Sequence, residues 1–184
     1  MYIHSIIPSS MVNGPYERTV VHFQGCTLNC PGCFNKDTHA MNIGRYMSAA
    51  EIMSNIPSHI KHVTISGGEP FLQAEGLHSL VTLLREKDYG IIVFSGFYLH
   101  EIMKMPYGEK ILANIDVLID GRFVKEELAV DGLRGSNNQT IHIFTNRYSP
   151  IELMNRNTEI LIDTNGNIQI TGFPSSFLLQ VLKD

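Results

Sequence analysis

The chain has 184 residues, 43% of them hydrophobic, and its 14 basic and 18 acidic side chains give a net charge of −4 with histidine neutral. This length suits one domain with a sizeable core, so we expect a single domain over residues 1–184. The basic residues are scattered, which argues against nucleic acid as a partner, and no apolar run is long enough to cross a membrane. The segment 1–8 lacks the features of a secretory signal, and together with the unpaired cysteines this predicts a cytoplasmic protein.

Short runs rich in β-branched residues alternate with longer helical stretches along the chain. The predicted strands cover residues 19–23, 62–66, 91–94, 116–119 and 141–144. This alternation indicates parallel strands joined by crossover helices, an α/β fold. The chain is too short for eight βα units, so we expect a partial (βα)6-type barrel of about six strands, open on one side.

Two helices and a hairpin have clear local signals. Ser48 followed by Glu51 is a capping-box signature that predicts the start of a helix. In the stretch 74–87 the apolar residues recur at helical spacing and form one buried stripe, made by Leu77, Leu80, Val81 and Leu84. Towards the C-terminus, an Asn165–Gly166 pair between two strand-like runs predicts a β-hairpin over residues 159–171.

All three cysteines of the chain, Cys26, Cys30 and Cys33, lie within eight residues after the first predicted strand. An odd number of thiols this close together does not form a disulfide framework. Because thiolates are soft ligands, the spacing C-x3-C-x2-C indicates zinc or an iron-sulfur cluster with three protein ligands and one open position. A zinc loop completed by His22 or His39 is the alternative.

A second motif, Val-Thr-Ile-Ser-Gly-Gly-Glu-Pro, occupies residues 63–70. A short apolar strand ends there, Gly67 and Gly68 permit close approach of the backbone to a ligand, and Glu69 offers a carboxylate to an ammonium group. An ordinary turn is the alternative. Each suspected motif follows a predicted strand, where ligands gather in βα folds.

The cysteine spacing resembles the signature of the radical S-adenosylmethionine (SAM) enzymes, in which SAM chelates the open iron of a 4Fe-4S cluster. The segment 63–70 resembles the glycine-rich SAM motif of that family. The resemblance implies a 4Fe-4S cluster on the three cysteines. It also implies SAM binding by Gly67, Gly68, Glu69 and Pro70.

Further segments resemble, in order, the activating enzymes of anaerobic ribonucleotide reductase. These segments are 14–15, 30–35, 94–97, 116–123, 134–139 and 170–174. Gly32 stands where the wider superfamily usually carries an aromatic residue, and glycine there is typical of the narrower group. The resemblance extends the cofactor site to Ser95, Arg134, Asn137 and Gln139. For the loop 134–139, a merely solvated role is the alternative.

Asp120 and Arg122 resemble the acidic-x-basic pair of the glycyl-radical activating enzymes, where the acid helps to hold a cation beside SAM or the substrate backbone. Arg122 replaces the more usual lysine. We take both as candidate catalytic residues, the alternative being a solvated turn at a strand end.

The resemblance implies that an electron, from a low-potential donor such as a flavodoxin, cleaves SAM to a 5'-deoxyadenosyl radical. That radical removes a glycine α-hydrogen from a partner anaerobic ribonucleotide reductase and leaves a glycyl radical. Two alternatives stay open: a radical SAM enzyme that acts directly on a small molecule or peptide, and a zinc-binding module without catalysis.

Overall fold

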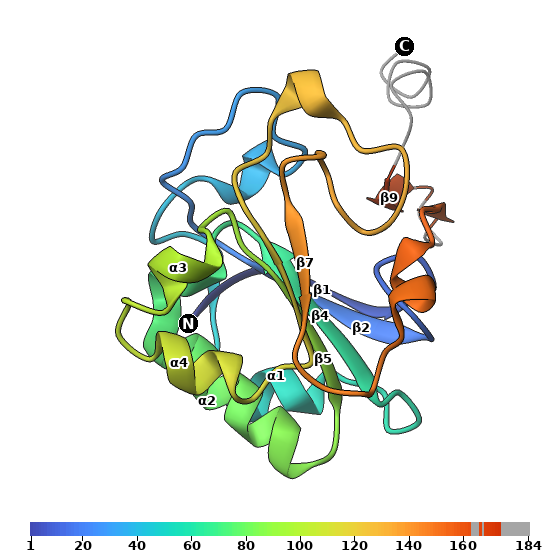
Figure 1. Ribbon diagram of the computed structural model, residues 1–184. Coiled ribbons are helices and arrows are strands. Elements are labelled where there is room, and N and C mark those ends of the chain that lie inside the picture. Colours follow the sequence, from blue (N-terminus) through green and yellow to red (C-terminus); the bar gives the residue numbers. More distant parts are fainter. Residues whose placement is uncertain (163–165, 167, 174–184) are drawn as a thin grey trace.

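A computed structural model describes residues 1–162, 166 and 168–173, and it is an α/β fold built on one seven-stranded sheet (Figure 1). The strand order is β3-β1-β2-β4-β5-β6-β7. Strands β2, β4, β5 and β6 are parallel, whereas β1, β3 and β7 each run antiparallel to a neighbour. The bounds are β1 Tyr2–Ser10, β2 Arg18–Phe23, β3 Arg45–Tyr46, β4 His62–Gly67, β5 Gly90–Phe94, β6 Val117–Asp120 and β7 Thr140–Ile143.

The helices are short except one, and Figure 1 shows α1, α2 and α4 together on one side of the sheet. They are α1 Ala49–Ser54, α2 Ala74–Glu86, α3 Leu99–Ile102 and α4 Gly108–Leu112, with 3-10 turns at Lys36–Thr38, Pro70–Gln73, Lys125–Glu127 and Pro150–Met154. The capping box of Ser48 and Glu51 is confirmed, because each side chain bonds the other residue's backbone N–H. The predicted stripe of α2 is also confirmed, since its four residues are fully buried.

Two hydrophobic clusters cover the two faces of the sheet. The larger one lies on the face of the sheet that the helices cover, here called the outer face, and includes Val93 and Leu118. The smaller one covers the inner face, where Ile92 and Ile119 meet Tyr148. Both faces of the central strands are therefore buried, which explains why their sequences are continuously apolar instead of alternating.

The fold class predicted from the sequence is confirmed, with a parallel core and a C-terminal hairpin of β8 (Thr158–Ile162) and β9 (Ile168–Gly172). One strand direction differs from the expectation. Strand β7 is antiparallel to β6, because the connection 121–139 contains no crossover helix and returns the chain to the same end of the sheet, pairing Asp120 with Thr140. Asn165 lies outside the described residues, so the predicted turn is not described.

Strand β1 was not predicted, and it adds the antiparallel edge beside β2. Its two register shifts interrupt the regular alternation that a sequence pattern would reveal. Among the residues that the structure describes, every helix is too short or too polar to cross a bilayer.

Candidate active site

The three cysteines lie on a loop that leaves β2 and is folded back on itself by backbone hydrogen bonds. Gly25 N–H donates to Thr38 O at 2.7 Å and Cys26 N–H donates to His39 O at 3.0 Å, so the loop closes at its base. Within it, Cys33 N–H bonds Cys30 O at 3.1 Å, and Gly32 has a φ of +74°. Glycine adopts a positive φ at little cost, which explains why glycine precedes the third cysteine. All three thiols are partly exposed.

A cavity of about 780 Å³ opens at the carboxyl ends of the parallel strands, where ligands bind in α/β folds. The cysteine loop forms one wall, and the segments after β4 and β5 form another. Gln139 and the hairpin strand β9 close further sides. The predicted residues that line this cavity are Cys26, Cys30, Cys33, Gly67, Gly68, Glu69, Ser95 and Gln139.

The two motif glycines are packed against the start of the cysteine loop. A Cβ atom on Gly67, where φ is +102°, would lie 2.5 Å from Phe23 O, and one on Gly68 would lie 2.4 Å from Gly25 O. Gly68 N–H donates to Phe23 O at 2.8 Å, and Glu69 N–H donates to Gly25 O at 2.9 Å. The glycines therefore let two chain segments meet backbone to backbone, in addition to any contact with a ligand.

Glu69 is a buried carboxylate on the cavity wall, with 1% of its surface exposed. Its Oε1 accepts hydrogen bonds from Phe71 N–H at 3.0 Å and from the Ser95 hydroxyl at 2.9 Å. Its Oε2 accepts from Gly96 N–H at 2.7 Å. Burial raises the pKa of Glu69 to about 7, against the opposing effect of these hydrogen bonds. A cation in the cavity would favour its ionised form.

The thiols lie close enough to repel one another when ionised. Burial raises the pKa of Cys26 and of Cys33, and the negative charge of neighbouring cysteines raises both further. These two thiols are therefore protonated at neutral pH unless positive charge, such as bound iron, stabilises the thiolates.

The arrangement fits a cluster better than a single zinc ion. Among the described residues no three His, Cys, Asp or Glu side chains converge as they would on one metal ion. Zinc requires its ligands to meet at one point, whereas the thiolates of a 4Fe-4S cluster bind separate irons and remain further apart. His22 and His39 both line the cavity, but neither joins the thiols in a single-ion geometry.

Asp120 and Arg122 do not line the cavity. On β6, Ile119 faces the inner cluster, so Asp120 faces the helices, where its Oδ2 accepts from Leu99 N–H at 2.5 Å and lies 3.2 Å from His142 Nε2. Arg122 forms a two-pronged pair with Glu101, with contacts of 2.5 and 3.0 Å. These two residues lie at the rim of the site and anchor the first turn of α3.

The loop residues separate into two groups. Gln139 lines the cavity and holds the loop, because its Oε1 accepts from Gly135 N–H and Ser136 N–H and its Nε2 donates to Gly121 O. Arg134 pairs with Asp131 at 3.1 Å, and Asn137 is exposed. Neither of these two is on the cavity wall. Pro70 opens the 3-10 turn after Glu69 and is buried beneath it.

The sequence predicted His22 only as an alternative zinc ligand, and it did not predict the rest of the cavity floor. His22 and Ser66 are register partners on β2 and β4, Phe94 follows on β5, and all three line the cavity from the inner face. Asn13 and Thr171 complete it, joined by a 2.7 Å hydrogen bond between the loop that connects β1 to β2 and strand β9. The signal available was a polar residue at inward positions of otherwise apolar strands, at the end nearest the cysteines.

Comparison with known proteins places this chain in a family. Residues 12–142 match the family described as a 4Fe-4S single cluster domain. The chain is 36% identical over 157 residues to the anaerobic ribonucleoside-triphosphate reductase-activating protein of Vibrio cholerae, and the match covers 79% of this chain and 99% of that relative. The protein of the same name from Escherichia coli K12 is 33% identical over 154 residues, with coverage of 77% and 98%.

A pyruvate formate-lyase-activating enzyme of Clostridium pasteurianum is also similar, at 36% identity over 135 residues, which cover 68% of this chain and 54% of that relative. The match to the reductase-activating proteins extends over nearly their whole length, whereas the match to the lyase-activating enzyme does not. The chain belongs to the radical SAM 4Fe-4S family, among the anaerobic ribonucleoside-triphosphate reductase-activating proteins, as its motifs indicated.

Proposed function

We propose that this protein is a radical SAM activating enzyme that installs a glycyl radical in an anaerobic ribonucleotide reductase. The observation that carries the proposal is that three thiols of one loop and the carboxylate of Glu69 line the same cavity. The names of the curated relatives support the choice of partner.

Cys26, Cys30 and Cys33 would each bind one iron of a 4Fe-4S cluster and leave the fourth iron to SAM. Bound there, the reduced cluster and SAM supply the radical that removes the glycine hydrogen. The chain's own contribution is to hold SAM beside the loop and to keep water away from the reacting atoms.

Glu69 is suited to hold the SAM ammonium group. Its carboxylate is fixed by Ser95 and Gly96, so it has little freedom to turn away from the cavity. Because it is buried, its attraction for a cation is weakly screened. Gly67, Gly68 and Pro70 support it by setting the course of the backbone.

Gln139 forms part of the wall through which the partner would approach, and it keeps the loop 121–139 in place. Arg134 and Asn137, on the outer side of that loop, would then contact the partner protein instead of the cofactor. For Asp120 and Arg122 we propose a positioning role, through α3, at the rim of the cavity. A glycine-bearing loop suits this site because it has no side chain to exclude.

A flavodoxin-like protein is the proposed electron donor, and the cytoplasm is the proposed compartment because the cluster and its donor need reducing conditions.

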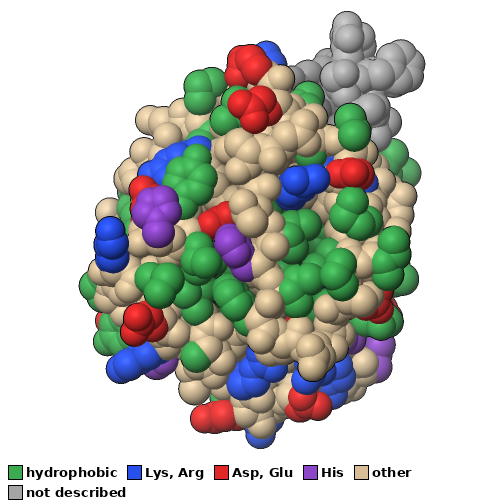
Figure 2. Space-filling view, in the orientation of Figure 1, with side chains coloured by type: hydrophobic (Ala, Val, Ile, Leu, Met, Phe, Trp, Pro, Cys, Tyr) green, Lys and Arg blue, Asp and Glu red, His purple; other side chains and the backbone are tan. Residues whose placement is uncertain are grey.

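We propose that residues 1–184 act as one domain, since the sheet joins the N-terminal strand to the segments around the cavity. On the face that Figure 2 shows, lysine and arginine side chains lie singly instead of forming one basic area.

The test is anaerobic incubation of the reduced, iron-loaded protein with SAM and an anaerobic ribonucleotide reductase. We expect a protein-based glycyl radical in the electron paramagnetic resonance spectrum, whose proton splitting collapses when the partner's glycine is deuterated at the α-carbon. Turnover of a free small molecule or peptide without any glycyl radical would instead favour the direct-acting radical SAM alternative. A colourless preparation that binds zinc and never iron would favour the zinc module.

A further inference from the structure

The segment after β6 packs against the outer side of the cysteine loop. The rings of Phe123 and Phe34 lie 5.1 Å apart, centroid to centroid, at an angle of 56°. Phe34, Phe123 and Gly32 also line the cavity, so this contact forms its edge, whereas Lys125 is not among the lining residues.

Within this contact the side chain of Lys125 lies directly over Gly32. A Cβ atom placed on Gly32 would lie 2.9 Å from Cδ, 3.2 Å from Cγ and 3.3 Å from Cβ of Lys125. Such distances leave no room for a side chain, so the stem of Lys125 occupies the volume that a residue at position 32 would use. The backbone of Gly32 and the methylenes of Lys125 are in van der Waals contact across the turn between Cys30 and Cys33.

The backbone beneath Lys125 is held in place. Val124 N–H donates to the hydroxyl of Ser136, which is fully buried, and Glu127 N–H donates to Val124 O. Glu127 O in turn accepts from Asn137 N–H at 2.7 Å. The lysine therefore projects from a fixed turn instead of a loose loop.

The ammonium group of Lys125 is exposed, and no carboxylate of the described residues lies within 4.0 Å of it. Arg122, by contrast, is already paired with Glu101. Other charges near the loop are Lys36, whose positive charge acts on Cys33, and the acidic residues Asp37, Glu126 and Glu127. Lys125 thus adds a positive charge without a direct partner on the outer side of the loop.

We propose that Lys125 is a positioning residue for the cluster-binding loop, an inference that rests on the proposed cluster. Its stem covers Gly32 and holds the turn that carries Cys30 and Cys33. Its ammonium group offsets the negative charge of the thiolates and the cluster. That negative charge increases by one unit when the cluster is reduced. A nearby positive charge stabilises the reduced cluster and so raises its reduction potential.

Two substitutions separate the stem from the charge. Lys125→Met keeps a stem of similar length without the charge, and Lys125→Gly removes both. Lys87→Met, at the end of α2 and away from the loop, is the matched control. The readouts are the rate at which a chelator removes iron from the anaerobic protein and the midpoint potential of the cluster in a redox titration followed by electron paramagnetic resonance.

We expect Lys125→Gly to lose iron about tenfold faster than the parent, as is typical when support behind metal ligands is removed. Lys125→Met should keep the parental rate but show a lower midpoint potential, and Lys87→Met should match the parent in both. A parent protein that binds no iron would overturn both this inference and the proposed function. An iron-loaded parent whose iron loss and potential are indifferent to position 125 would overturn this inference alone.

Discussion

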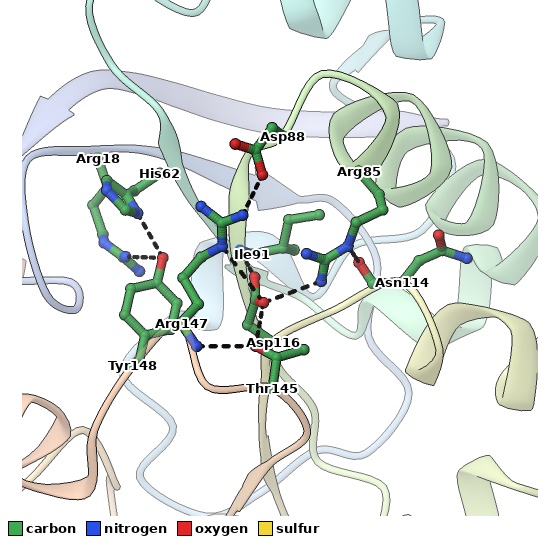
Figure 3. A network of polar contacts seen from close by, with 10 residues as sticks. All are labelled: Arg18, His62, Arg85, Asp88, Ile91, Asn114, Asp116, Thr145, Arg147 and Tyr148. Carbon is green, nitrogen blue, oxygen red and sulfur yellow. Dashed lines mark hydrogen bonds and ion pairs between the residues drawn. The ribbon is translucent and has the colours of Figure 1, made fainter.

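The two ends of the parallel strands both carry polar side chains, but these side chains differ in what they contact. At the amino end, Figure 3 shows a network in which Asp116 accepts from Ile91 N–H at 2.7 Å and pairs with Arg85 at 3.1 Å. Beside it, the fully buried Arg18 donates to Tyr148, whose hydroxyl is 2.7 Å from His62. Most of these groups bond one another, although Arg85 Nη2 lies 3.1 Å from Asp116 Oδ1 without a hydrogen bond. Arg85, Asp116 and Arg147 border a smaller cavity of about 380 Å³.

At the carboxyl end, the polar groups line the larger cavity, of about 780 Å³. The three thiols are partly exposed, and the carboxylate of Glu69, although fixed from behind, borders open volume. A network that satisfies itself contributes to folding, whereas groups directed into a cavity are available to a ligand. Stability and chemistry are therefore assigned to opposite ends of one sheet, and substitutions at the two ends should have different consequences.

The largest effect on activity is expected from Cys30→Ala. Removing one of three thiolates should abolish both bound iron and SAM cleavage, while the unfolding free energy of the iron-free protein stays within about 1 kcal/mol of the parent, as for other partly exposed positions. Iron content, SAM cleavage and denaturant unfolding check this. Retention of a full cluster would contradict the ligand assignment. Extensive unfolding would contradict the view that the carboxyl end of the sheet serves chemistry and not stability.

The largest effect on stability is expected from Asp116→Ala. The substitution leaves Arg85, Arg147 and the buried N–H of Ile91 without their common acceptor. Loss of one partner in a buried charged network typically costs about 3–5 kcal/mol, which urea unfolding would measure. Asp88→Ala removes an exposed carboxylate paired with Arg147 and serves as control, with an expected change of at most about 1 kcal/mol. Equal losses in the two variants would refute the proposed role of the network.

Gly68→Val should affect both cofactors. The added side chain would collide with the backbone of Gly25, next to Cys26, and overpacking of this kind costs about 1–3 kcal/mol. We therefore expect weaker SAM binding together with lower iron content. From the sequence alone, the expectation would be that cluster assembly is spared. Normal iron content with impaired SAM binding would show that the loop absorbs the collision.

SAM binding should depend on pH through Glu69. The ammonium group favours the ionised carboxylate, so affinity should rise with pH, by up to about tenfold per unit, and level off above pH 7. The effect on stability has the opposite sign. In the folded protein the pKa of Glu69 is raised above its usual value. The stability that its protonated carboxyl contributes to the fold is therefore fully present below about pH 4.5 and is lost as pH rises through 7. Titration calorimetry checks the binding profile, and a Glu69→Gln protein with the same profile would exclude this carboxylate as its cause.

The smallest effect is expected from Arg134→Ala. Among the described residues the Arg134 side chain pairs with the exposed Asp131, so stability should change by less than about 0.5 kcal/mol and SAM affinity should not change. Gln139→Ala is the informative companion, because Gln139 bonds three backbone groups and its loss should cost about 1–3 kcal/mol. Equal behaviour of the two variants would remove the distinction between the inner and outer sides of the loop.

The parts of the site that the sequence predicted are those encoded by local spacing. The three cysteines and the glycines before Glu69 are close in sequence, and a strand precedes each motif, so their convergence follows from the rule that parallel strands share a carboxyl end. The strands and the stripe of α2 were predicted from another local signal, the pattern and period of apolar residues.

What the sequence could not predict depends on contacts between distant segments. Whether Asp120 faces the cavity or the helices is set by strand register, and a shift of one residue reverses it. The direction of β7 depends on the path of a long loop without a helix. The contact of Lys125 with Gly32 joins residues 93 positions apart, and no periodicity marks it.

The backbone hydrogen bonds from Gly68 and Glu69 to Phe23 and Gly25 extend the sheet beyond the end of β4. Because main-chain amides make these bonds, the segment before Cys26 and the segment around Glu69 should open and close as one cooperative unit. Hydrogen exchange would report this unit directly. Loading iron onto the cysteines should slow exchange at the amides of Gly68 and Glu69 even without SAM, so the protein would signal cluster occupancy from a segment that does not touch the metal.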